Sequence, residues 1–168
     1  MNLLALAFPP TQTGRALWIL FAALATLAAV WIFQALGYRP CELCLTERYA
    51  FYAGAPLAAL VAFLGARAAT GAARAGLVLL ALAFLANAAL AGYHAGVEYQ
   101  LWPGPTACAG AMSAPIDVND LLKQIQTTPE PRCDEAALRV LGLSLAGWDM
   151  AASAALAVYA ALAARFAR

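Results

Sequence analysis

Four long apolar stretches restrict the fold of this 168-residue chain more than any other feature. A helix needs about 20 largely apolar residues to cross a bilayer, with a range of about 17–25. The stretches cover residues 17–36, 49–66, 76–93 and 143–164. Hydrophobic residues make up 64% of the chain and charged residues 11%, which is more apolar surface than a soluble domain of this length can bury. The sequence predicts an all-α membrane protein, a four-transmembrane-helix bundle forming one integral membrane domain.

The basic residues predict the orientation of this bundle in the bilayer. One side carries no acidic residue and holds Arg15, Arg67, Arg74, Arg165 and Arg168. By the positive-inside rule this side, with both termini, faces the cytoplasm. The opposite side then holds two outer loops, residues 37–48 and 94–142. In a bacterium the protein would be a multi-pass inner-membrane protein whose outer loops lie in the periplasm, an oxidising compartment in which disulfides persist.

The second outer loop is long and has two recognisable parts. Its start is rich in Pro and Gly over residues 102–105, which indicates irregular backbone. Over residues 116–125 apolar and polar side chains are spaced as in a short amphipathic helix. We expect that helix to lie on the membrane surface and to hold the loop near the bilayer.

All four cysteines fall in these outer loops, as a close pair and a distant pair. Cys41 and Cys44 form a C-x-x-C motif, whereas Cys108 and Cys133 are 25 residues apart. A close pair is a poor structural staple because so short a loop restricts little chain entropy, and redox activity is the favoured interpretation. A zinc site, completed by His94 or the other cysteines, and a purely structural disulfide are the alternatives. For the distant pair, a stabilising disulfide is as plausible as an exchanging one.

Two further residues lie close to the cysteines. If a helix begins near Cys44, Arg48 lies one turn further on the same face, where it either stabilises a thiolate or snorkels to the interface. His94, at the predicted end of the third helix, either makes interfacial hydrogen bonds, donates one to a quinone carbonyl or carries a proton. Glu98, one turn away, either is solvated in the loop or orients the His94 ring. Trp148 and Asp149 are interpreted as interfacial residues.

Three segments together resemble the DsbB family of disulfide-bond-forming inner-membrane proteins. Residues 41–48 match a C-x-L-C-x-x-x-R signature. Residues 93–98, Tyr-His-Ala-Gly-Val-Glu, resemble the end of that family's third helix, and Cys133-Asp134 with residues 141–148 resemble the entry to its fourth. The resemblance covers nearly the whole chain. The segment 101–109 is less familiar, which leaves the mode of partner docking open.

The resemblance implies a protein-disulfide:quinone oxidoreductase that reoxidises a DsbA-type periplasmic thiol oxidase and delivers two electrons to the membrane quinone pool, either ubiquinone or menaquinone. It implies two redox disulfides, Cys41–Cys44 and Cys108–Cys133. Cys108 would form the mixed disulfide with the partner, Cys133 would exchange with Cys41, and Cys44 would be the thiolate beside the quinone. Arg48 would support that thiolate, and His94 would lie near the quinone.

Two other functions are compatible with parts of the sequence. A vitamin K epoxide reductase-like relay also joins thiols to quinone, but there the loop pair precedes the C-x-x-C, whereas here it follows. A non-enzymatic membrane protein with two structural disulfides has no positive support. No nucleic-acid partner is expected, because the chain has neither a basic run nor a phosphate-binding glycine loop. No metal is assigned to the favoured redox interpretation; a zinc site stays the alternative named above.

Overall fold

Four long helices dominate the computed structural model, which describes residues 9–105 and 132–166. The helices are α2 (Gln12–Ala35), α3 (Glu42–Ala66), α4 (Thr70–Glu98) and α6 (Leu145–Arg165). Each is long and apolar enough to cross a membrane. Large apolar side chains such as Phe21 and Leu85 are exposed on the outer faces of the helices, as expected where lipid replaces water. The predicted all-α membrane fold with four spanning helices is confirmed.

The helices start and stop at positions that differ from the apolar stretches. α3 begins at Glu42 rather than near residue 49, and α4 continues to Glu98 rather than ending near residue 93. The polar turn after Cys41 and the segment after Tyr93 therefore belong to helices, although the sequence predicted loops there. The hydropathy pattern measures only the apolar part of a helix, and a helix can extend past that part into polar surroundings.

Side-chain caps define the starts of three helices. Thr11 and Ser144 accept hydrogen bonds from the backbone N–H groups of Gly14 and Gly147, both at 3.1 Å. At α3 the cap is a sulfur atom, since Cys41 Sγ accepts from the N–H of Cys44 at 3.2 Å. Each cap satisfies one of the N–H groups that a helix start leaves without a partner.

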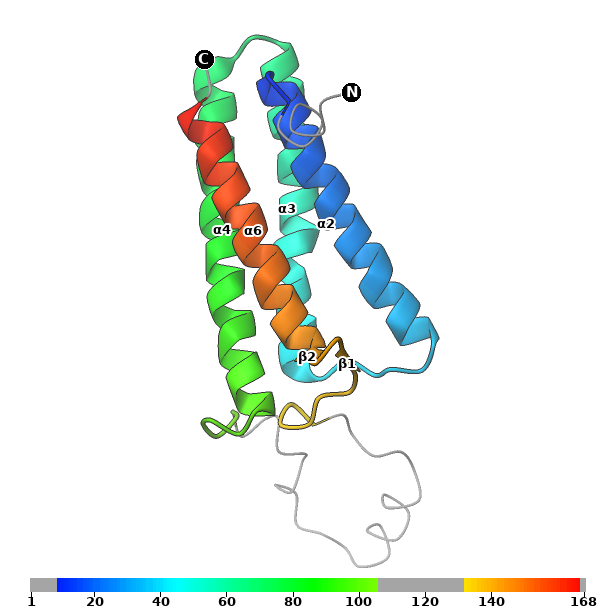
Figure 1. Cartoon of the computed structure of the whole chain (residues 1–168). Helices are drawn as coiled ribbons and strands as arrows, with labels where there is room; N and C mark the ends of the chain where they lie inside the picture. The colour runs from blue at the N-terminus through cyan, green and yellow to red at the C-terminus, as the bar shows by residue number, and fades with distance from the viewer. Residues whose placement is uncertain (1–8, 106–131, 167–168) are drawn as a thin grey trace, which may run out of the picture.

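Small residues allow the helices to pack closely. The buried core combines many alanines with a few large side chains, among them Ile19, Leu77 and Phe84. A Cβ atom at Gly54 of α3 would lie 2.8 Å from the ring of Phe84 on α4, so glycine permits this approach. Figure 1 shows α4 beside α6 and α2 beside α3, with α2 and α6 diverging toward the end at which α3 begins.

A short β-hairpin, which the sequence analysis did not predict, leads into α6. Its strands, β1 (Arg139–Val140) and β2 (Leu143–Ser144), are antiparallel, with Arg139 opposite Ser144. Leu141 and Gly142 at the turn have φ of 54° and 86°, the positive values that a two-residue hairpin turn requires. The hairpin lies at the same end of the bundle as the start of α3 (Figure 1). The predicted amphipathic helix over residues 116–125 lies outside the described residues.

Candidate redox site

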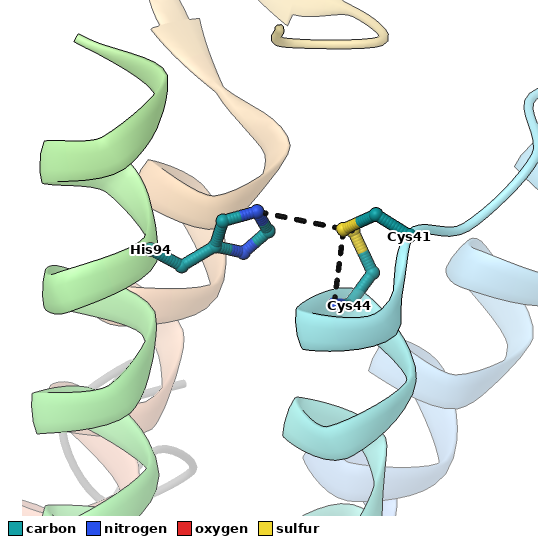
Figure 2. A group of neighbouring side chains, drawn as sticks. All are labelled: Cys41, Cys44 and His94. Atoms are coloured by element: carbon teal, nitrogen blue, oxygen red, sulfur yellow. Dashed lines mark hydrogen bonds between the residues drawn. The ribbon is translucent and has the colours of Figure 1, made fainter. Parts of the chain in front are cut away.

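The first cysteine pair lies at the N-terminus of α3 and faces α4. Cys41 Sγ is 2.7 Å from Cys44 Sγ and 3.5 Å from Nε2 of His94 (Figure 2). Both cysteines are free thiols, and Cys41 is only 5% exposed. The sequence predicted a loop over residues 37–48, with a helix start near Cys44 as a condition for the role of Arg48; the structure begins α3 at Glu42, with Cys41 as its cap.

Three contacts favour a thiolate at Cys41. The hydrogen bond between the two sulfur atoms favours the thiolate of Cys41 when Cys44 is its donor, and although burial opposes the effect, His94 and the backbone N–H of Cys44 act in the same direction. Together they lower the pKa of Cys41 to about 4. A thiolate is the species that attacks disulfides. In this dithiol state the contacts that stabilise a thiolate converge on Cys41 rather than on Cys44, for which the sequence analysis predicted that role.

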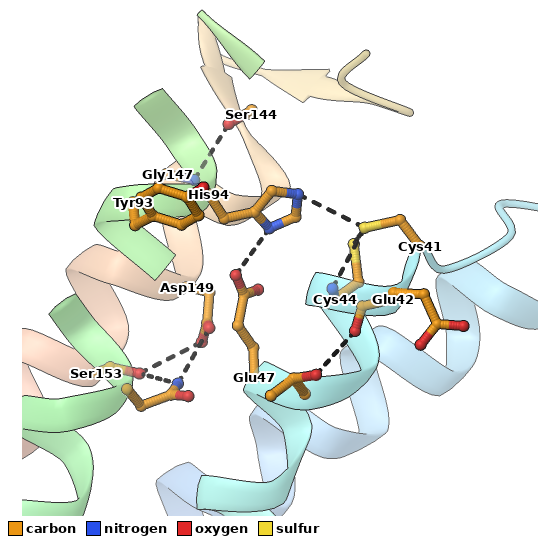
Figure 3. A network of polar contacts seen from close by, with 12 residues as sticks. Cys41, Glu42, Cys44, Glu47, Tyr93, His94, Ser144, Gly147, Asp149 and Ser153 are labelled. Atoms are coloured by element: carbon orange, nitrogen blue, oxygen red, sulfur yellow. Dashed lines mark hydrogen bonds and ion pairs between the residues drawn. The ribbon is translucent and has the colours of Figure 1, made fainter. Parts of the chain in front are cut away.

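His94 is held by a carboxylate on another helix. It is 1% exposed inside α4, and its Nδ1 lies 2.7 Å from Oε1 of Glu47 on α3 (Figure 3). From the sequence, His94 was predicted to lie at the end of the third helix, with Glu98 either orienting its ring or solvated in the loop; in the structure Glu47 contacts the ring instead. With Nδ1 directed at Glu47, Nε2 is the ring nitrogen that faces Cys41. Glu47 is thus a site residue that sequence spacing did not identify, because 47 positions separate it from His94.

Arg48 contacts the first helix. Its Nη1 donates to Oε1 of Gln34 at 2.8 Å, and its guanidinium lies 5.8 Å from the centroid of the Trp31 ring. Arg48 was expected to support a thiolate at Cys44; among the described residues its hydrogen bond goes to Gln34, and it shares a cavity wall with Cys44. The functional role of Arg48 remains a prediction.

That cavity measures about 780 Å³ and lies between α2, α3 and α6. Its polar and sulfur-bearing wall includes Cys41, Cys44, Glu47, Arg48, Glu98 and Asp149. The α2 wall is mostly apolar and includes Leu27, Val30 and Phe33, and Ala152 belongs to the α6 wall. The site therefore joins two sulfur atoms to a space that is large enough for a small organic molecule.

The second cysteine pair is described only in part. Cys133 is disulfide-bonded, 1% exposed, and packed in one buried cluster with Cys41. Beside it, Arg132 donates two hydrogen bonds to the carboxylate of Asp134, at 2.9 and 2.6 Å, and these lower the pKa of Asp134. Cys108, predicted to pair with Cys133, lies outside the described residues. The structure thus brings a cysteine from the second loop to the first pair.

Asp149 and Trp148, which were interpreted from the sequence as interfacial residues, each make a hydrogen bond to another part of the chain. Asp149 accepts a hydrogen bond from Asn87 of α4 at 3.1 Å, and Ser153 joins the same group (Figure 3). These bonds satisfy polar groups between α4 and α6, as expected for an asparagine inside a membrane bundle. Trp148 is half-exposed, and its Nε1 donates to the carbonyl of Val140 at 2.9 Å, which fastens the hairpin to α6.

Comparison with known proteins identifies similar sequences. The family model described as disulfide bond formation protein DsbB matches residues 12–163. Disulfide bond formation protein B 1 of Pseudomonas fluorescens is 32% identical over 130 residues, which cover 74% of this chain and 72% of that protein. No solved structure gives a significant match to the chain.

Proposed function

Because the chain belongs to the DsbB family of disulfide bond formation proteins, we propose that it reoxidises a periplasmic DsbA-type thiol oxidase and passes two electrons to membrane quinone. One observation carries this proposal. Cys133 packs against Cys41, and Cys41 lies 2.7 Å from Cys44 beside a cavity. A chain of sulfur atoms that ends at a cavity suits a relay of thiol–disulfide exchange.

The proposed thiol–disulfide exchange accounts for every bond and electron when Cys41–Cys44 and Cys108–Cys133 both begin as disulfides. The thiolate of the reduced partner attacks Cys108 Sγ, a mixed disulfide forms, and Cys133 leaves as a thiolate. Cys133 then attacks Cys41 Sγ, and Cys44 leaves as a thiolate. The second thiol of the partner resolves the mixed disulfide, and its electrons end on Cys108. When Cys108 in turn attacks the Cys133–Cys41 bond, the distant pair is a disulfide again, and Cys41 and Cys44 hold the two electrons.

The cavity has the properties that a quinone head group needs. Its apolar α2 wall suits a flat ring, and Arg48 supplies a donor for a carbonyl oxygen. When bound, quinone accepts the two electrons with two protons. Ubiquinone and menaquinone share this chemistry.

Several residues of the chain can hold the protons that accompany the electrons. His94 Nε2 faces Cys41 Sγ, and its Nδ1 faces Glu47, so the ring can hold a proton next to the reacting sulfur. Glu98 and Asp149 bring two more carboxyl groups to the cavity wall. In the described ranges, Oε2 of Glu98 is buried without a hydrogen-bond partner, so this oxygen is free to carry a proton.

The proposal also includes the location of the protein. We place it in the inner membrane of a bacterium, with both termini in the cytoplasm and the cysteines in the periplasm. The arginines at positions 15, 67, 74 and 165 belong to the ends and the connection opposite the cysteine site, which supports this orientation.

The test is a reoxidation assay with the purified full-length protein in detergent. Reduced DsbA-type protein is supplied with ubiquinone or menaquinone, and quinol and partner disulfide are both measured. We expect them in a 1:1 ratio, and we expect Cys44→Ser to abolish quinol formation while the protein remains folded. Failure with both quinones would overturn the proposal, and so would full activity of the Cys44→Ser variant.

A further inference from the structure

The reduced cysteine pair and His94 have the donor set of a metal site. We infer that the dithiol form binds one borderline-soft divalent cation, with Zn²⁺ as the best match, through Cys41 Sγ, Cys44 Sγ and His94 Nε2. The three donor atoms lie within 4.8 Å of one another (Figure 2). Two thiolates and an imidazole are the ligands that Zn²⁺ prefers, and three protein ligands leave a fourth position for water.

The distances are close to those of a tetrahedral centre. Zn–S bonds of about 2.3 Å and Zn–N bonds of about 2.0–2.1 Å place sulfur and nitrogen roughly 3.6 Å apart. Cys41 Sγ and His94 Nε2 are already 3.5 Å apart. The two sulfurs, now at 2.7 Å, must separate to roughly 3.8 Å, which needs a small side-chain rotation at Cys44.

Glu47 gives His94 the orientation that a metal ligand needs. Metal-binding histidines commonly donate the second ring N–H to a carboxylate, which fixes the ring and makes the ligating nitrogen more basic. Here Nδ1 is paired with Glu47 Oε1 at 2.7 Å, so Nε2 points toward the sulfurs (Figure 3). A carboxylate behind the histidine is a second observation that favours a metal, independent of the cysteine spacing.

Binding exchanges protons for the cation. Zn²⁺ replaces the proton on Cys44 Sγ and the proton shared by Cys41 Sγ and His94 Nε2, and no electron is transferred. While the cation is bound, neither sulfur is available to form a disulfide. Zn²⁺ would therefore hold the pair in its reduced state; this consequence rests on the proposed function, whereas the binding does not.

The experiment measures binding directly, without partner or quinone. The full-length protein in detergent is reduced without oxygen, and Zn²⁺ is titrated against a chromophoric chelator. Co²⁺ serves as a spectroscopic probe, and Mg²⁺ as the negative control. We expect one Zn²⁺ per chain, together with the thiolate-to-cobalt absorption of a tetrahedral site. We expect both in the Cys108→Ser/Cys133→Ser variant and neither in Cys44→Ser or in the oxidised protein.

Two glutamates provide a matched comparison. Glu47→Gln should weaken Zn²⁺ binding by roughly 10–100-fold, the usual effect of losing a carboxylate behind a ligand histidine. Glu42→Gln removes the same charge at an exposed position next to Cys41 and should change affinity by less than about twofold. The inference fails if the reduced protein binds no Zn²⁺, if the two variants bind equally well, or if the Cys108→Ser/Cys133→Ser variant loses the ion.

Discussion

Cys41 combines two properties at the scale of a single residue. It caps α3 through its sulfur, and that sulfur is also the reactive atom of the pair. A serine at this position would keep a cap and lose the redox chemistry. One atom therefore contributes to both helix stability and reactivity, and the Cys41→Ser substitution allows the two contributions to be measured separately.

The pKa of about 4 gives Cys41 a distinctive pH dependence. In a Cys108→Ser/Cys133→Ser/Cys44→Ser protein we expect the serine hydroxyl to replace the Cys44 thiol as hydrogen-bond donor to Cys41. The alkylation rate should rise through about pH 4 and be flat near neutral pH, since only the thiolate reacts. With Cys44→Ala, which removes the donor, the midpoint should move upward. A midpoint near the ordinary cysteine value of 9.0 in both proteins would contradict this assignment.

The same shift links stability to pH with a definite sign. The pKa falls from 9.0 to about 4 on folding, so the thiolate stabilises the folded dithiol form. This contribution is complete above pH 9 and is lost as the pH falls through about 4. It also favours the dithiol over the disulfide, because only the dithiol form contains the thiolate.

At the scale of elements, the sequence predicted where the apolar helices lie but not where they end. The hydropathy of residues 49–66 does not include the turn from Glu42 to Arg48, whose helical form depends on a cap at Cys41. Cysteine is not among the usual cap residues, so this start carries no strong local signal. A cap supplied by a sulfur atom becomes visible only in three dimensions.

The candidate site shows the same division between local and distant contacts. The four cysteines and the Cys44–Arg48 spacing could be read from the chain, because they are properties of neighbouring residues. The Glu47–His94 pair could not, since it forms only when α3 packs against α4. Helical spacing offered Glu98 as the partner of His94, and the packing of the helices selected Glu47.

The cavity between α2, α3 and α6 can be tested with one enlarged side chain. Ala152→Phe places a ring against a wall of the cavity and should raise the quinone KM roughly tenfold, equivalent to about 1.4 kcal/mol of binding. Ala86→Phe introduces the same ring on an exposed face of α4, outside the cavity wall, and should leave the KM unchanged. Steady-state kinetics at varied quinone concentration distinguishes them. Equal KM values for the two variants would contradict a quinone site in this cavity.

For the whole molecule, the ends of the bundle differ in chemistry. Arg67 and Arg74 flank the connection between α3 and α4, and Arg15 holds the ends of α2 and α6 together by donating to the carbonyls of Pro9 and Phe166 at 2.9 and 3.0 Å. The cysteines, the hairpin and the Glu47–His94 pair occupy the other end (Figures 1 and 3). Under the positive-inside rule the basic end would be the cytoplasmic one, and the redox end would then face the opposite side of the membrane.

This asymmetry predicts which end a membrane-impermeant thiol reagent reaches. In a background with all four cysteines replaced by serine, Ala68→Cys and Leu141→Cys form a matched pair. Both positions are exposed and both have positive φ, 55° and 54°, but they lie at opposite ends of the bundle. By the positive-inside rule, an impermeant maleimide should label Leu141→Cys in spheroplasts and Ala68→Cys only in inverted vesicles. The reverse pattern would place the cysteines in the cytoplasm, where reducing conditions oppose stable disulfides, and would contradict a periplasmic oxidase partner.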